Sequence, residues 1–285
     1  MKDTIYSREQ YLRKKAAEKE PLNIQLTNNY AFRKLFKMNY IARGFLIALL
    51  GLDEEDVVKL EVIDPFEEGE NEEEKEGILD IKIYLNDNKK INIEMQNRYQ
   101  EDWTERSLFY NCRMFTEGLY HGQPYGDLEP CIHVGILDFD LMKTPGFHHH
   151  IKLLDIKTNE EYSSKLQFHV VQLKQVESAT EEEKQTELYY WAKLLAAKDW
   201  KQVEETIRGN PYREAVKNEM YKMSQDEKER YLYLREEMAV SDEVSRMRTA
   251  KDEGIQLAKK VFKYTAAQIA EECNIEESEV KEILA

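Results

Sequence analysis

The sequence predicts an α/β fold with a mixed central sheet flanked by helices, followed by an all-helical C-terminal region. Two neighbouring runs alternate apolar and polar residues, which is typical of strands. A helical segment then leads to a long apolar run, which indicates a βαβ crossover. Only helical patterns follow Thr180. We therefore expect an α/β domain over residues 1–176 and a helical region over residues 177–285.

The segments before the alternating runs are predicted to be mainly helical. Asn28 or Asn29 is a good N-cap, because a short polar side chain accepts hydrogen bonds from the first free amides of a helix. Gly51 is a typical helix end. We expect a charged leading helix, two core helices and a first strand, over residues 1–20, 28–40, 41–50 and 57–63.

The two alternating runs are predicted to form a hairpin. They cover residues 78–85 and 91–96, and the connector at 86–89 is rich in Asn and Asp, which favour turns. Successive side chains of a strand point to opposite faces, so each run has one apolar and one polar face. The pattern places Asp80 and Glu94 on a shared face. Two carboxylates this close require a cation or a proton between them.

The segments after the hairpin complete the sheet. We expect a long helix and then three strands, over residues 101–120, 131–139, 148–152 and 168–173. Arg106, Tyr110 and Arg113 share one face of the long helix because they are four and then three residues apart. This face either approaches a phosphate group or is a surface face on which Glu117 pairs with Arg113.

The last helices include a long charged helix over residues 224–249, which Gly254 is expected to interrupt. Residues 265–284 resemble a helix-turn-helix with Asn274 at the turn. Its second helix is acidic and would be repelled by DNA phosphates, which favours packing or partner binding over DNA contact.

Composition sets further bounds. The net charge of −15 disfavours general nucleic-acid binding, although a local basic groove remains compatible with it. Much of the acid lies in residues 67–76, which we expect to be a solvated loop. The chain has no apolar run of 18 residues and no apolar leader, so neither a membrane span nor a secretion signal is expected. Three cysteines without CxxC spacing favour a cytoplasmic location without disulfides.

The strand residues also carry a family resemblance. An acid on one strand followed by Glu-x-Lys on the next is the core of the PD-(D/E)XK nuclease fold. This chain has Asp80 and then Glu94-Met95-Gln96, with Gln in the Lys position. The chain resembles the recombination-promoting nuclease and putative transposase family of that superfamily. The other segments that carry the likeness are residues 26–36, 105–110, 118–125 and 132–139.

The resemblance implies a restriction-endonuclease-like core and a metal-dependent DNA endonuclease. Asp80, Glu94 and Gln96 would be the catalytic residues. Mg²⁺ or Mn²⁺ would be held by Asp80, by Glu94 and by the backbone carbonyl of Met95. Asn29 would be a weak ligand, since the family usually has an acid there and a neutral oxygen binds a hard dication less strongly. The DNA phosphates would be contacted by Arg106, Tyr110 and Arg113.

Other interpretations stay open. Asn29 and the acidic charge favour a catalytically weakened relative that acts through protein–protein interaction, or through self-association of its C-terminal helices as a homo-oligomer. A DNA-binding regulator that uses the last two helices is a third class. His148 and His150 share a strand face, but no nearby acid or cysteine completes a metal site, so we expect a structural role.

Overall fold

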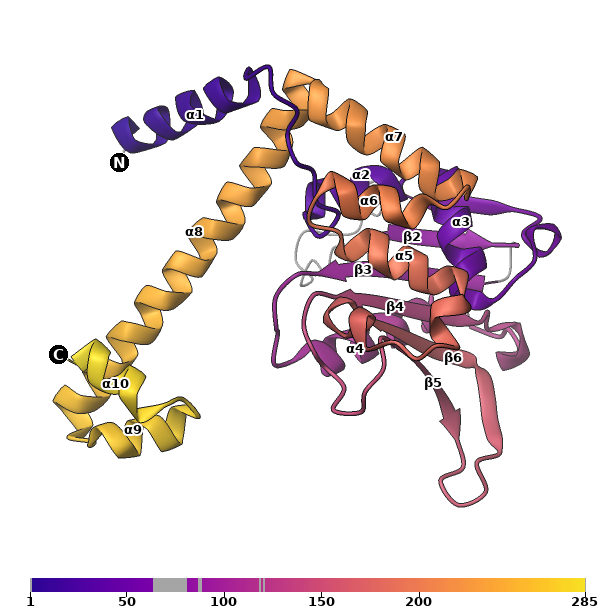
Figure 1. Cartoon of the computed structure of the whole chain (residues 1–285). Helices are drawn as coiled ribbons and strands as arrows, with labels where there is room; N and C mark the ends of the chain where they lie inside the picture. The colour runs from indigo at the N-terminus through magenta and orange to yellow at the C-terminus, as the bar shows by residue number, and fades with distance from the viewer. Residues whose placement is uncertain (1, 64–80, 87–88, 118, 120, 285) are drawn as a thin grey trace. The chain divides into compact units, whose positions relative to one another are not determined.

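The computed structural model describes residues 2–63, 81–86, 89–117, 119 and 121–284 (Figure 1). Asp80, the acidic segment 67–76 and the turn residues 87–88 lie outside the described residues.

The described strands form one mixed sheet in the order β1-β2-β3-β4-β6-β5. Neighbours are antiparallel except for the parallel pairs β3–β4 and β4–β6. β4 lies inside the sheet and every one of its residues is buried, as suits its long apolar run. The strands are β1 (Leu60–Ile63), β2 (Ile81–Leu85), β3 (Lys89–Gln96), β4 (Cys131–Leu137), β5 (His148–Leu154) and β6 (Glu161–Gln172).

Helices lie before, between and after the strands. Asn28 is the N-cap of α2, because its Oδ1 accepts hydrogen bonds from the amides of Tyr30 and Ala31. Gly51 ends α3 in the left-handed conformation, with φ 62°, as predicted. The α-helices are α1 (Lys2–Ala16), α2 (Asn29–Phe36), α3 (Asn39–Leu50), α4 (Trp103–Thr116), α5 (Glu187–Ala196), α6 (Trp200–Ile207), α7 (Pro211–Gln225), α8 (Glu227–Leu257), α9 (Ala266–Cys273) and α10 (Glu277–Leu284).

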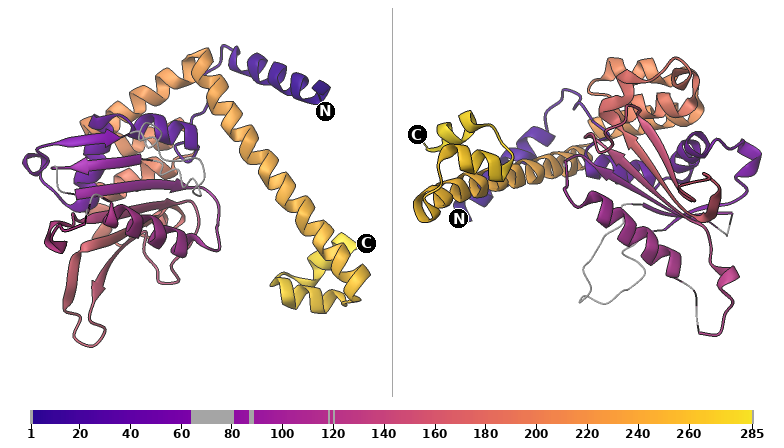
Figure 2. Two further views of the ribbon diagram at one scale, coloured as in Figure 1. Left: turned by 180° about the vertical axis from the view of Figure 1, so that it is seen from behind. Right: turned by 90° about the horizontal axis from the view of Figure 1, so that it is seen from below.

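Helices cover both faces of the sheet. Figure 2 shows α4 on one face and α5 and α6 on the other. The alternation predicted a polar face on β3, and the structure shows that this face is covered and not open to solvent. Lys90, Asn92 and Glu94 are all buried on that face, because α4 packs against β3 and β4.

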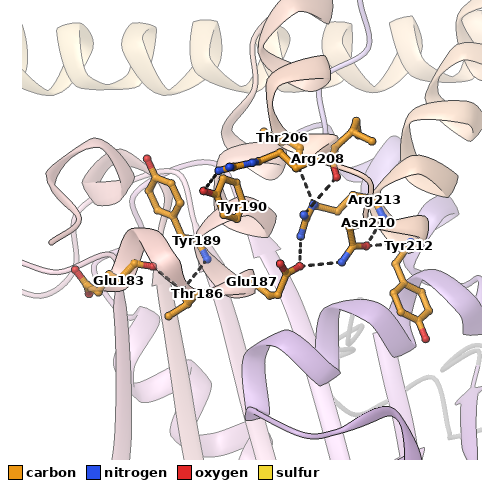
Figure 3. A network of polar contacts seen from close by, with 11 residues as sticks. Glu183, Thr186, Glu187, Tyr189, Tyr190, Thr206, Arg208, Asn210, Tyr212 and Arg213 are labelled. Atoms are coloured by element: carbon orange, nitrogen blue, oxygen red, sulfur yellow. Dashed lines mark hydrogen bonds and ion pairs between the residues drawn. The ribbon is translucent and has the colours of Figure 1, made fainter. Parts of the chain in front are cut away.

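A buried arginine joins α5, α6 and α7 (Figure 3). The Arg213 guanidinium donates to the Glu187 carboxylate at 2.5 Å and to the backbone carbonyl of Thr206 at 2.7 Å. Asn210 caps α7 and also donates to Glu187 at 2.8 Å. These contacts attach the helices that follow the sheet to one another.

Contacts divide the chain into the units Met1–Tyr233 and Leu234–Ala285. The sequence predicted a boundary at residue 176, where the strands end. The helices α5 to α7 instead belong to the first unit, because α5 and α7 pack against α3.

The second unit has its own small core, made by Ile255, Ile269, Ala270 and Val280. α9 and α10 meet at Asn274, which has φ 50°, so the predicted helix pair is confirmed. α8 continues through Gly254 as far as Leu257, so the predicted interruption at that glycine is wrong. Over the described ranges, no helix is long and apolar enough to cross a membrane.

Candidate functional site

Glu94 is a buried acid that pairs with an arginine of α4. It lies near the end of β3 on the face covered by α4, and its side chain is 4% exposed. Oε1 of Glu94 accepts a hydrogen bond from Nε of Arg106 at 3.1 Å and forms an ion pair with Nη2 at 2.9 Å. A buried carboxylate is costly unless a positive charge compensates it. Arg106, whose side chain is 33% exposed, supplies this charge from α4.

A close approach of α4 to the sheet makes this contact possible. Gly135 of β4 is the neighbour of Glu94 in the parallel register. A Cβ atom at Gly135 would lie 2.6 Å from Cζ2 of Trp103, which is too close for any real contact. Trp103, the first residue of α4, therefore fills the space that the missing side chain leaves. The packing of Trp103 against Gly135 sets how closely α4 lies to the sheet, and no motif in the chain predicts this contact.

The polar layer beneath α4 also contains a neutral histidine. Nδ1 of His133 lies 3.1 Å from the Asn92 amide nitrogen, so Nδ1 accepts and the ring proton is assigned to Nε2. Burial, and then the charge of Arg106, lower the pKa of His133 to about 3. His133 is therefore uncharged at neutral pH, and it contributes no positive charge beside Glu94.

The predicted face of α4 is present. The Arg106 guanidinium carbon lies 5.2 Å from the centre of the Tyr110 ring, a cation–π contact. Arg113 lies one turn further along and is half-buried. Glu117, considered above as a partner of Arg113, accepts a hydrogen bond from Lys82 at 3.0 Å. The structure thus brings Arg106 together with both Tyr110 and Glu94.

The start of α2 is tied to the end of β3. The side-chain amide of Asn97 donates to the carbonyl of Thr27 at 3.2 Å. Asn29 is the first residue of α2, and its Oδ1 is buried without a hydrogen-bond partner among the described residues. Gln96 is half-buried at the last position of β3. An unpaired buried oxygen is costly and is suited to accept a donor or to ligate a cation.

The oxygen atoms of this site are of the type that a hard divalent cation prefers as ligands. Mg²⁺ and Mn²⁺ prefer carboxylate and amide oxygens, which Glu94 and Asn29 offer. No group of three His, Cys, Asp or Glu side chains within the described ranges could hold a metal ion. A carboxylate pair at Glu94 therefore depends on Asp80, which lies outside those ranges. The side chain of Met95 is buried on the opposite face of β3, and the role of its carbonyl stays a prediction.

Three histidines form a separate stack on β5 and β6. The His169 ring lies 5.2 Å from that of His148 and 4.1 Å from that of His150, centre to centre. Nε2 of His148 and Nδ1 of His169 are 2.9 Å apart and bond to each other. These two nitrogens bond to each other, and the structural role of the stack stays a prediction.

The mixed sheet with helices on both faces and a buried acid on an inner strand is consistent with the PD-(D/E)XK nuclease fold. Residues 26–250 match the family described as PD-(D/E)XK nuclease family transposase. This match covers most of the chain, so the protein belongs to that family, as the resemblance predicted. Neither the curated proteins nor the solved structures compared with the chain gave a match.

Proposed function

We propose that this protein is a metal-dependent DNA endonuclease that hydrolyses phosphodiester bonds. The observation that carries the proposal is the buried Glu94 carboxylate, on an inner strand of a PD-(D/E)XK family chain, with Arg106 of α4 in contact with it. Family membership alone does not establish activity. The proposal therefore rests on what the residues of this site can do.

Asp80 and Glu94, with the carbonyl of Met95, would hold Mg²⁺ or Mn²⁺. A cation bound there lowers the pKa of a water molecule and neutralises charge on the phosphate. Gln96, next along β3 on the same face as Glu94, positions the attacking water through its amide group. Because the amide is neutral, Gln96 cannot supply the positive charge of the lysine that usually stands in this place.

The phosphate would be bound from α4. Arginine presents a planar fork of donors that suits phosphate oxygens. Tyr110 limits the positions open to the Arg106 guanidinium through the ring contact, and Arg113 extends the positive surface by one turn. The acidic chain repels DNA as a whole. Binding therefore depends on these local charges together with the cation.

The test is plasmid nicking in Mg²⁺. Asp80→Ala should abolish nicking and leave the melting temperature nearly unchanged, because the change removes a proposed metal ligand and adds no bulk. Asp140→Ala, which alters an exposed aspartate, should nick at the wild-type rate. Equal nicking by Asp80→Ala and by the wild-type protein would remove the basis of the proposal.

A second candidate is a nuclease-fold protein with weakened catalysis that acts through self-association. Val244 and Met247 of α8 are 50% and 62% exposed, and apolar side chains three residues apart share a helix face. If this face joins two copies, light scattering should find a dimer that the double variant Val244→Lys, Met247→Lys converts to a monomer. A monomeric wild-type protein at high concentration would exclude this candidate.

A further inference from the structure

The side chains of Glu94 and Arg106 differ in how far they can move. Glu94 sits on an inner strand between β2 and β4 and is 4% exposed, so its carboxylate cannot move far. Arg106 reaches it with a long side chain from α4 and is 33% exposed. Both contacting nitrogens of Arg106, Nε and Nη2, approach the same oxygen, Oε1. Because this side-on contact involves only one carboxylate oxygen, rotation of the arginine side chain alone can release it.

The ring of Tyr110 offers the Arg106 guanidinium a contact that does not depend on Glu94. Tyr110 is one turn along α4 and already contacts the Arg106 guanidinium through its ring face. An arginine that leaves Glu94 can therefore turn toward solvent along Tyr110 without losing this contact.

Charge balance favours such an exchange. In the described state the positive charge of Arg106 balances the carboxylate of Glu94. A dication ligated by Glu94 would lie beside the same guanidinium, and like charges in a water-poor site repel one another strongly. An incoming phosphate group carries the negative charge that both cations can share. The motif position that usually holds a lysine is Gln96 here, so strand β3 supplies no cation of its own at that position.

We infer that Arg106 is a displaceable internal cation: a divalent metal ion displaces it from Glu94, and the released guanidinium binds the phosphate of the nucleic acid. This inference rests on the proposed function. The inference implies that metal and nucleic acid bind cooperatively. The Glu94–Arg106 pair opposes the binding of both, because it occupies the metal ligand and the phosphate-binding arginine at once. Binding of either one breaks the pair and so favours binding of the other. The inference also assigns to Arg106 the positive charge that Gln96 cannot provide.

The test is a titration of the full-length protein with Mn²⁺ alone, in which free Mn²⁺ is followed by electron paramagnetic resonance. Arg106→Gln should bind Mn²⁺ about tenfold more tightly than the wild-type protein, because the competing cation is gone. Arg106→Lys keeps the charge and should stay within about twofold of the wild-type affinity. Arg248→Gln removes the same charge from an exposed residue of α8 and should behave like the wild-type protein.

A second titration adds a DNA duplex with phosphorothioate linkages that resist cleavage. The duplex should tighten Mn²⁺ binding to the wild-type protein and have little effect on Arg106→Gln. Weaker or unchanged Mn²⁺ affinity in Arg106→Gln, with intact circular dichroism, would overturn the inference. If the wild-type protein and Glu94→Gln bind Mn²⁺ equally, the proposed function itself fails, and the two failures are thereby distinguished.

Discussion

The side-chain oxygen Oδ1 of Asn29 lies in a buried position where it requires a hydrogen-bond donor or a cation. This oxygen accepts no hydrogen bond from the described residues, which costs about 1–3 kcal/mol for a neutral group. Asn28, not Asn29, caps α2, so the side chain of Asn29 does not stabilise the helix end. A cation or a substrate donor at this point would compensate the cost.

Asn29→Asp should therefore strengthen the site. It would place a carboxylate where the family usually has an acid, and an acid in the first turn of α2 is favoured by the helix dipole. We expect Mn²⁺ affinity and plasmid nicking to rise about tenfold, as a charged oxygen replaces a neutral one. Asn23→Asp, an exposed change before α2, is the matched control. No gain of nicking in Asn29→Asp would show that this position does not serve the reaction.

At the scale of elements, the separation of α4 from the sheet decides whether Arg106 reaches Glu94. Gly135→Ala would force Trp103 away from β4, since the added methyl group meets the indole ring. We expect a stability loss of about 1–3 kcal/mol from overpacking, a shift in tryptophan fluorescence, and slower cleavage. The loss is measured by urea unfolding.

Gly126→Ala is the control for this change, because nothing lies within 4 Å of the added atom. Wild-type fluorescence and cleavage in Gly135→Ala would mean that the contact between Trp103 and β4 does not position α4.

The histidine stack predicts a pH dependence of stability. Burial, and then the neighbouring histidines, lower the pKa of His148 to about 4; burial, His150, His148 and Lys152 lower that of His169 to about 3. The carboxylate of Glu183 opposes the shift of His148 only weakly. Unfolded histidine titrates near 6.5. At a pH between the low pKa values of the folded protein and about 6.5, the unfolded chain thus binds more protons than the folded chain. Stability therefore falls as the pH drops below about 6.5.

Urea unfolding at pH 7.5 and pH 4.5 measures this effect. The wild-type protein should lose on the order of a few kcal/mol, since one pKa unit corresponds to about 1.4 kcal/mol. His169→Gln should lose distinctly less over the same interval. His121→Gln, an exposed change, should match the wild-type slope. An identical pH slope in His169→Gln would contradict a titrating stack.

Periodicity, caps and order along the chain are enough to predict β3, an N-cap at Asn28 or Asn29, the end at Gly51 and the apolar strand β4. These features do not reveal which helix covers a given face of the sheet. The alternation of Asn92 and Glu94 with apolar residues shows which side chains share a side, but α4 covers that side through a contact between Trp103 and Gly135. The Glu94–Arg106 pair follows from this packing, so the spacing of the two residues along the chain does not predict it.

At the scale of the whole molecule, the chain combines a family fold with an acidic charge of −15. The family match extends from before α2 to residue 250 in α8 and so includes part of the second compact unit. The sheet unit contains every described residue of the candidate site. A chain this acidic has little general attraction for DNA, so in the proposed function the cation and the arginines of α4 would be the decisive charges.

Anomalous diffraction from crystals soaked in Mn²⁺ tests the central claim most directly. The account predicts one strong peak within bonding distance of both the Glu94 and Asp80 carboxylates, with the Arg106 guanidinium turned away from Glu94. A structure without that peak, in which Arg106 still bonds Oε1 of Glu94 at high Mn²⁺ concentration, would contradict it.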